Sequence, residues 1–259
     1  MRYLINNIIN VSEVPGVIRK LLFSILLCGA LLYCRCKSNS EKTATITNTT
    51  NEYAAVRELS IIEVVGKDTT DVNGELLLQT GKQNGVLNPA VYKWNNHTVL
   101  MGTMKEPEPI RRQVVAQFPD KKVNVYSKPF YEFNRKQCRN GEVAKEWDHV
   151  LLTANLVQDT VVQREYLNYH ATQAKNWPEV AKGFCNANFQ QLLLFKNGRQ
   201  LMLVISIPKG ASLEELNPKT TENNPRADEW NALMKKYQEG IPGTKKGEIW
   251  VSLEPVKNS

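Results

Sequence analysis

Apolar and polar residues follow two different periods along the chain from about residue 58 onward. Continuous or alternating apolar runs predict strands, and apolar residues three and four apart predict helices. In the first half, the pattern predicts a strand, a helix, a strand hairpin turning at Asn95-Asn96, a second helix and a strand. These segments cover 59–66, 75–83, 90–104, 106–118 and 122–133.

The second half repeats this order more clearly. It predicts a strand, a helix that Asp159 or Thr160 can cap, a hairpin turning at Asn197-Gly198, a helix ending at Gly240 and a closing strand. These segments cover 149–157, 160–177, 189–208, 229–240 and 247–256. A β–α–β–β–α–β unit is ferredoxin-like, with its helices on one face of the sheet only.

Two tandem ferredoxin-like units can pack their open sheet faces together within one chain. The expected fold class is therefore α+β, a pseudo-dimer that resembles a dimeric α/β barrel. The expected domains are a degenerate ferredoxin-like domain over 58–145 and a second domain over 146–259, with 134–148 connecting them. A single four-stranded domain with an irregular extension is the alternative, because the first helix is weakly patterned.

An apolar run, LLFSILLCGALLYC, occupies residues 21–34 and has the length of a signal-peptide core. It is short for a membrane span, which needs about 20 apolar residues. With the polar low-complexity stretch behind it, the run resembles a bacterial lipoprotein leader. We expect a leader over 1–36, lipidation at Cys34, a disordered tether over 37–57 and a membrane-anchored, exported protein on the periplasmic or cell-surface side. An uncleaved signal anchor is the alternative.

The formal net charge of +7 comes from dispersed residues. Because no Lys/Arg block is interleaved with aromatic residues, a nucleic-acid partner is not expected. Cys138 and Cys185 remain in the body of the protein, where they can pair in an oxidising compartment or stay as separate buried thiols. Neither lies in a CxxC or His-spaced pattern, so we expect no zinc site.

One helix face has an unusual composition. Within 160–177, Tyr166, His170, Gln173 and Trp177 follow one another at offsets of four, three and four residues. Every member has a polar tip, whereas a core stripe is normally aliphatic. Aromatic planes with hydroxyl, imidazole and amide edges suit a sugar. The alternative is a packed core face that contains a hydrogen-bonded histidine.

These residues resemble the L-rhamnose mutarotase family over about 150–256. The resemblance is carried by Tyr166-x3-His170, the run Trp177-Pro178-Glu179-Val180, Gly183, Asn188, the hairpin QLMLVISI, Trp230 and Met234. It implies an α+β barrel that is dimeric in known members, with one sugar site per subunit. Because the duplicated pattern could supply the second subunit's place, we expect a monomeric pseudo-dimer or a homodimer.

The resemblance also implies roles for particular residues. His170 matches the catalytic proton donor, and Tyr166 matches a sugar-contacting tyrosine one turn before it. Trp230 matches the first of a Trp-Trp pair at the substrate, and Asn231 stands at the second position. Phe189 is the nearest match to a further substrate tyrosine. Trp177 is also a candidate substrate-binding residue, although three additional residues separate it from His170.

The expected function is therefore a sugar mutarotase, an isomerase that interconverts the α and β anomers of L-rhamnose or a related small neutral monosaccharide. Histidine suits ring opening because both of its protonation states are accessible near neutral pH. The reaction requires no cofactor and no metal, and the sequence offers no site for either. A non-catalytic sugar-binding accessory lipoprotein is the main alternative. A monooxygenase on the same architecture would rest on fold analogy alone.

Overall fold

The computed structural model describes residues 58–69 and 72–256, all of which belong to one compact unit. The expected leader, the tether and Cys34 lie outside these residues. Within the described ranges, no helix is both long enough and apolar enough to cross a membrane.

The first half forms the predicted β–α–β–β–α–β unit. Its elements are β1 (Glu58–Val65), α1 (Gly74–Gln83), β2 (Leu87–Trp94), β3 (His97–Met104), α2 (Pro107–Gln117) and β4 (Lys122–Tyr126), and its strands lie in the order β4-β1-β3-β2. The weakly patterned first helix does form. The Asn73 side chain caps it by accepting hydrogen bonds from two backbone N–H groups, and Leu77 and Leu78 are buried against the sheet.

The segment predicted as one strand over 122–133 is two strands, so this prediction was wrong. After β4, the chain leaves the first half's sheet near Pro129, which has no N–H to donate to a strand ladder. The second strand, β5 (Tyr131–Asn134), pairs with β7 (Gln191–Asn197) in the second half, with Tyr131 opposite Leu194. A short 3-10 helix, η2 (Arg135–Gln137), follows it.

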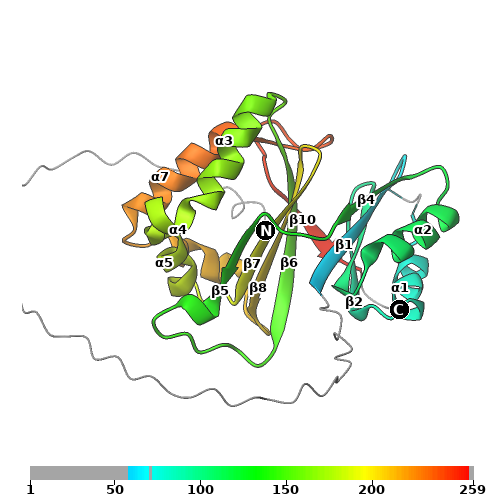
Figure 1. The fold of residues 1–259 in the computed structure, drawn as a ribbon, viewed down its shortest axis with the longest axis horizontal. Helices are drawn as coiled ribbons and strands as arrows, with labels where there is room; N and C mark the ends of the chain where they lie inside the picture. Colours follow the sequence, from blue (N-terminus) through cyan, green and yellow to red (C-terminus); the bar gives the residue numbers. More distant parts are fainter. Residues whose placement is uncertain (1–57, 70–71, 257–259) are drawn as a thin grey trace, which may run out of the picture. The chain divides into compact units, whose positions relative to one another are not determined.

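The second half repeats the same strand arrangement, in the order β10-β6-β8-β7. Its remaining strands are β6 (Trp147–Leu156), β8 (Gln200–Pro208), β9 (Gln238–Glu239) and β10 (Val251–Pro255). Its helical elements are α3 (Thr160–Ala171), α4 (Gln173–Asn176), α5 (Pro178–Asn186), α6 (Leu213–Leu216), η3 (Asn217–Thr220), α7 (Pro225–Met234) and η4 (Lys235–Tyr237). Figure 1 shows α3, α5 and α7 on one face of this sheet.

Two predicted helices have different boundaries in the structure. The helix predicted over 160–177 ends at Ala171, capped at its start by Asp159, and is followed by α4 and by α5, which begins at Pro178. Proline has no N–H for a helical hydrogen bond, so it starts a helix more readily than it continues one. The helix predicted over 229–240 begins earlier, at Pro225, and ends at Met234.

The last strand of each half completes the sheet of the other half. Whereas β5 extends the second half's sheet at β7, β10 pairs first with β6 and then, through Glu254 and Pro255, with β2. The strands therefore form one ten-stranded antiparallel sheet within the described residues. β10 pairs both with its own half, at β6, and with the other half, at β2. In the first half, two strands share this role: β4 pairs with β1 of its own half, and β5 pairs with β7 of the other half. The predicted tandem ferredoxin-like α+β architecture is confirmed.

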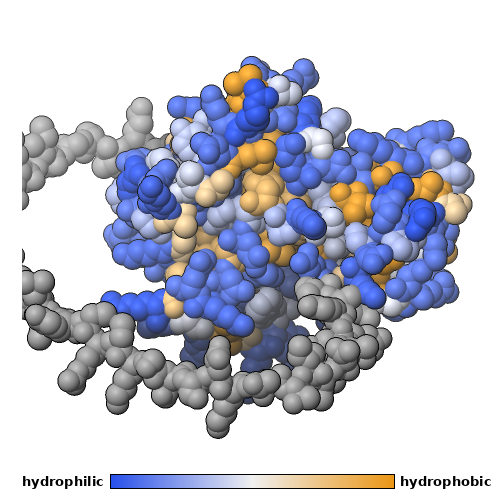
Figure 2. All heavy atoms as spheres, in the orientation of Figure 1, coloured by the Kyte–Doolittle hydropathy of each residue, from blue (hydrophilic) through white to orange (hydrophobic). Residues whose placement is uncertain are grey.

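Buried apolar residues form three clusters, two under the helices and one between the two sheet halves. The cluster between the sheet halves contains residues from both halves, including Ile61, Tyr126, Leu151 and Phe195. The cluster under the second half's helices is the largest and contains Trp230 and Trp250. The outer face drawn in Figure 2 is mainly hydrophilic, with apolar residues in small separate groups.

A buried polar group lies on the inward face of β1. Glu63 is fully buried, and its carboxylate accepts hydrogen bonds from His97 Nδ1 (2.7 Å), Asn124 Nδ2 (2.8 Å), Tyr126 Oη (2.9 Å) and Gln200 Nε2 (2.8 Å). Gln200 belongs to β8, so this polar cluster links the two halves through hydrogen bonds as well as packing.

Candidate functional site

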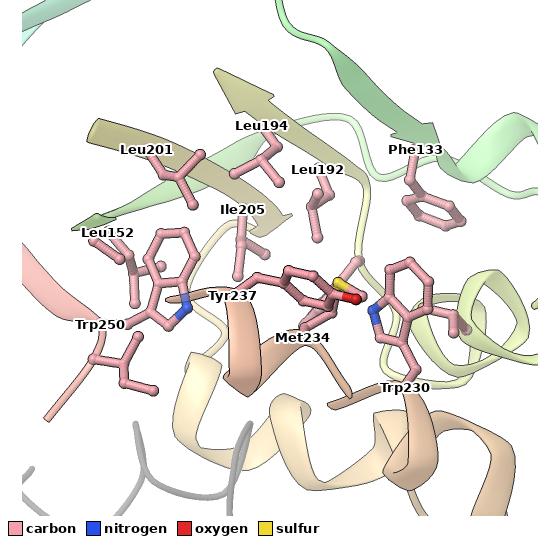
Figure 3. Packing of buried hydrophobic residues seen from close by; sticks show 14 of the residues in the cluster. Phe133, Leu152, Leu192, Leu194, Leu201, Ile205, Trp230, Met234, Tyr237 and Trp250 are labelled. Carbon is pink, nitrogen blue, oxygen red and sulfur yellow. The ribbon is translucent and has the colours of Figure 1, made fainter. Parts of the chain in front are cut away.

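A cavity lies between the second half's sheet and its helices. Its floor is apolar and is formed largely by Leu192, Leu194, Leu203 and Ile205 from β7 and β8. Figure 3 shows three of these side chains facing the layer that contains Trp230, Met234, Tyr237 and Trp250. The lining also includes Tyr131, Tyr166, His170, Gln173, Phe184, Phe189, Asn217, Thr220, Asn231 and Gln238.

His170 is held deep in this cavity by the last turn of α3. It is only 8% exposed, and Nδ1 lies 3.0 Å from the backbone carbonyl oxygen of Tyr166. Because a carbonyl oxygen only accepts, Nδ1 carries a proton and donates it, which leaves the lone pair of the neutral ring on Nε2. Within the part of the chain that the structure describes, Nε2 has no hydrogen-bond partner.

Aromatic rings surround the His170 imidazole. Ring centroids lie 4.3 Å away for Tyr166, 5.1 Å for Trp230, 5.2 Å for Tyr131 and 5.6 Å for Phe130. Burial among these rings disfavours the charged imidazolium and lowers the pKa of His170 to about 4, although the hydrogen bond to the Tyr166 carbonyl opposes this shift. The side chain is therefore a neutral base at neutral pH.

Tyr166 lies one turn before His170 and is almost completely buried. Its phenol oxygen accepts a hydrogen bond from Gln238 Nε2 at 3.0 Å, and Gln238 Oε1 in turn accepts from Trp250 Nε1 at 3.2 Å. Burial raises the pKa of Tyr166, so that the phenol keeps its proton. With its oxygen already accepting, Tyr166 has its own O–H available to donate to a ligand.

The structure brings together most of the residues that the sequence singled out. Tyr166, His170, Phe189, Trp230 and Asn231 all line the cavity. Trp177 does not line it. Its ring lies 5.6 Å from that of Trp230, and the Arg226 guanidinium carbon sits 3.9 Å from its ring centroid, so Trp177 supports Trp230 from outside the lining.

Several lining residues were missed by sequence reasoning. Gln173 belongs to the helix-face pattern but was given no role of its own, although it is 2% exposed and lines the cavity. Tyr131 precedes the second half altogether and reaches the cavity only because β5 pairs with β7. Gln238 lies just beyond η4, in a segment expected to be helical. Only pairing between distant strands places Tyr131, so no local signal could have found it.

The two remaining histidines lie outside this cavity. His97 is the first residue of β3, directly after the predicted turn at Asn95-Asn96, and it is paired with Glu63. His149 lies in β6, as expected of a strand residue, with Nδ1 2.9 Å from Ser206 Oγ. Among the described residues, no group of three or more His, Cys, Asp or Glu side chains could hold a metal ion.

The two cysteines in the described ranges form a disulfide. Cys138 follows η2, Cys185 lies in α5, and their Cα atoms are 5.8 Å apart. Of the two alternatives for these residues, the paired state is the one that the structure contains. The bond ties the segment after β5 to a helix that covers the cavity.

The chemistry of the lining defines the class of ligand. No Asp, Glu, Lys or Arg occurs in it. Four polar groups of lining residues have no hydrogen-bond partner within the described ranges: His170 Nε2, Trp230 Nε1, Gln173 Nε2 and the Asn217 amide. An uncharged cavity with apolar walls and several free donors and acceptors is suited to a small neutral molecule that carries several hydroxyl groups.

Comparison with known proteins places this site in a carbohydrate-isomerase family. The family model described as L-rhamnose mutarotase matches residues 149–257. A UPF0734 protein of Dictyostelium discoideum is 31% identical over 106 residues, which cover 39% of this chain and 82% of that protein. Through this region, the chain belongs to the L-rhamnose mutarotase family. An L-fucose mutarotase of Xanthomonas campestris is 27% identical over 100 residues, 37% of this chain and 75% of that enzyme.

Solved structures with a similar arrangement include two from Listeria. A monooxygenase-like protein of Listeria innocua matches with a TM-score of 0.38 and 13% identity, over 78% of this chain and 95% of that chain. A heme-degrading enzyme of Listeria monocytogenes matches with a TM-score of 0.38 and 10% identity, over 76% of this chain and 99% of that chain.

Proposed function

We propose that this protein is a sugar mutarotase that interconverts the α and β anomers of L-rhamnose or a closely related neutral sugar. The observation that carries the proposal is His170. It is buried and neutral, its Nδ1–H is bound to the Tyr166 carbonyl, and its Nε2 lone pair is free in an uncharged cavity. Family membership supports the reaction class.

The proposed step opens and recloses the sugar ring. His170 Nε2 takes the proton from the C1 hydroxyl oxygen while the C1–O5 bond breaks, and C1 becomes an aldehyde carbon. The imidazolium then gives this proton to O5, which is bonded to the same carbon in the closed ring and is therefore within reach. Rotation about C1–C2 and the reverse steps give the other anomer. The proton is returned in each cycle, so the reaction is balanced without a co-reactant.

Tyr166 has a positioning role in this scheme. Its raised pKa makes loss of the proton unfavourable, so it acts as a hydrogen-bond donor to the ring oxygen rather than as the acid. Trp230 supplies an aromatic plane beside His170 for the CH face of the ring. The floor of Leu192, Leu194 and Ile205 suits the methyl group of a deoxy sugar.

Saturation-transfer NMR between the two anomeric protons tests the proposal directly. The purified protein should accelerate exchange for L-rhamnose or L-fucose above the buffer rate, and His170→Ala should reduce this acceleration by about 10²–10⁴-fold. His149→Gln is a matched control, because His149 lies outside the cavity, and this variant should retain exchange. Near-UV circular dichroism checks that both variants keep their tertiary packing.

The outcome also decides between catalysis and simple binding. If the protein leaves anomer exchange of both sugars at the buffer rate, the mutarotase proposal fails. Tight binding of one sugar without acceleration would instead indicate a non-catalytic sugar-binding protein. Asn231 stands where the resembled family has the second tryptophan of a Trp-Trp pair. This difference at the substrate supports the second candidate, a protein that binds sugar without catalysis.

We also propose that the protein is exported to an oxidising compartment and anchored by a lipid at Cys34. The Cys138–Cys185 disulfide supports the compartment, because disulfides persist there and are rare in the cytosol. Metabolic labelling with an alkyne fatty acid, compared between the native chain and Cys34→Ser, tests the anchor. Equal labelling of both would contradict lipidation at this residue.

A further inference from the structure

We propose that Gln173 and Tyr131 together bind the C2 hydroxyl of the sugar and so determine which sugars the site accepts. This inference rests on the proposed function, since it needs a sugar in the cavity. It adds two residues from outside the resemblance, one from the additional residues after His170 and one from the first half of the chain.

One end of the Gln173 amide is hydrogen-bonded and the other end is free. Gln173 is 2% exposed and lines the cavity, and its Oε1 accepts a hydrogen bond from the Tyr131 hydroxyl at 2.5 Å. Its Nε2 has no partner among the residues that the structure describes. A free amide donor on a cavity-lining residue is suited to an acceptor oxygen on a ligand.

Tyr131 orients that amide. The Tyr131 hydroxyl donates its only proton to Gln173 Oε1. This hydrogen bond holds the amide oxygen at Tyr131, so the NH₂ group points away from Tyr131. Burial raises the pKa of Tyr131, so the phenol keeps this proton. The Tyr131 oxygen retains its lone pairs and can accept from a sugar hydroxyl. The pair therefore offers one donor and one acceptor, which is what a single hydroxyl group requires.

Gln173 and Tyr131 lie beside His170, the residue assigned to the reacting carbon. His170 acts at C1, and Gln173 follows it by three residues, with the Tyr131 ring centroid 5.2 Å from that of His170. In a pyranose ring, C1 has only two ring neighbours, O5 and C2. Because Tyr166 is assigned to O5, the remaining neighbour next to His170 is C2. Sugars that differ at C2 should therefore be distinguished by Gln173 and Tyr131.

The pair also compensates for a difference from the family pattern. Phe189, the nearest match to the family's further substrate tyrosine, has no hydroxyl to offer. Tyr131, from β5, supplies a hydroxyl group at the same cavity. Gln173, from α4, lies in the same lining and accepts a hydrogen bond from that hydroxyl. The additional residues between His170 and Trp177 thus have a function in the site, and the first half contributes a residue to the second half's cavity.

Binding of matched sugars tests this proposal in the full-length protein. Dissociation constants are measured by tryptophan fluorescence for L-rhamnose, L-fucose and the 2-deoxy analogue of each. The native protein should bind a parent sugar about tenfold more tightly than its 2-deoxy analogue, the effect of one hydrogen bond. Gln173→Met keeps the side-chain length without the amide and should reduce this preference at least threefold, because the donor to the C2 oxygen is lost. Tyr131→Phe should reduce the preference at least threefold.

Tyr169→Phe is the matched control. Tyr169 packs near Trp230 and Tyr237 but does not line the cavity, so this variant should keep the native preference. The proposal is overturned if Gln173→Met and Tyr131→Phe both retain the native preference, or if they weaken a parent sugar and its 2-deoxy analogue by the same factor. Binding does not require turnover, so a protein that binds sugar without accelerating exchange would refute the mutarotase proposal alone. Failure to bind any of the four sugars would refute both.

Discussion

At the scale of single residues, His170 shows how burial changes ordinary chemistry. Its pKa of about 4 lies well below the 6.5 of a free histidine, because an imidazolium among four aromatic rings loses its hydration. In the proposed mechanism the neutral ring is the base, so protonation should abolish turnover only in quite acidic solution. A histidine left in water would already lose half its activity near pH 6.5.

This difference predicts the pH dependence of turnover. After subtraction of the buffer rate, kcat/KM should remain level as the pH falls from 8 to about 5 and should fall steeply near pH 4. Saturation-transfer rates collected across this range would measure the profile. A midpoint near 6.5 would contradict the assignment of His170 in its buried state as the base.

Glu63 gives a second residue-scale prediction, this time for stability. Burial raises the pKa of Glu63, but the hydrogen bond and charge of His97, with hydrogen bonds from Asn124 and Gln200, lower it below its usual value. A carboxylate with a lowered folded pKa stabilises the fold above its unfolded pKa, and this stabilisation is lost as the pH falls through the folded pKa.

Glu63→Gln should therefore lower the free energy of unfolding at pH 7 by about 3–5 kcal/mol, as expected when one partner of a buried pair is removed. The difference from the native protein should shrink as the pH falls below the ordinary range of a glutamate and through the lowered folded pKa of Glu63, where the native carboxylate gains a proton. Urea denaturation at pH 7 and pH 3.5 measures both values. Glu108→Gln, which removes one partner of an exposed ion pair, is the control and should leave the urea midpoint unchanged. If both variants lower the free energy of unfolding by the same amount, the role of Glu63 is refuted.

At the scale of elements, the disulfide fixes the position of β5. Cys138 and Cys185 are 47 residues apart in sequence, and a bond that closes a loop of this length typically contributes about 2–4 kcal/mol. Because Cys138 lies four residues after β5 ends, the bond also restrains the strand that carries Tyr131.

Cys138→Ser with Cys185→Ser should accordingly lower the unfolding free energy by about 2–4 kcal/mol and should also weaken sugar binding. Equilibrium unfolding and fluorescence titration of the oxidised protein, the reduced protein and the double variant separate the two effects. A double variant with native stability would show that packing alone holds β5 against β7.

The helices and strands also show which features of the fold local sequence patterns can predict. Periodicity predicted the β–α–β–β–α–β order of both halves, and the Asp159 cap was expected, because caps and alternation are local properties. The break at Thr172 was not predicted, since the apolar spacing continues through it to Trp177. Tyr166 and His170 share a helix face and could be paired from sequence. Tyr131 could not, because strand pairing across the chain brings it to them.

At the scale of the whole molecule, the exchange of last strands predicts the assembly state. The resemblance to the L-rhamnose mutarotase family implies a barrel whose other half a second subunit would provide. Here β5 covers the free edge of β7, and the end of β10 covers that of β2. With these edges occupied, the chain has no need of a second copy to complete its sheet.

We therefore predict a monomer for the full-length protein without its lipid. Size-exclusion chromatography with light scattering should give a mass near the 29.4 kDa of one chain at concentrations up to about 100 µM, well above those at which a specific dimer with a micromolar Kd would form. A stable mass of twice this value would show that another surface, outside these sheet edges, mediates association.

The position of β10 has a further consequence for how the protein is made. The first half leaves the ribosome well before residues 251–256 exist, yet the edge of its strand β2 is paired by Glu254, Pro255 and Val256. During synthesis this edge stays open until residues 254–256 emerge, and open edges are where nascent chains join wrongly. A chain cut short before residue 251 would thus contain nearly all of the core but leave the edge of β2 unpaired.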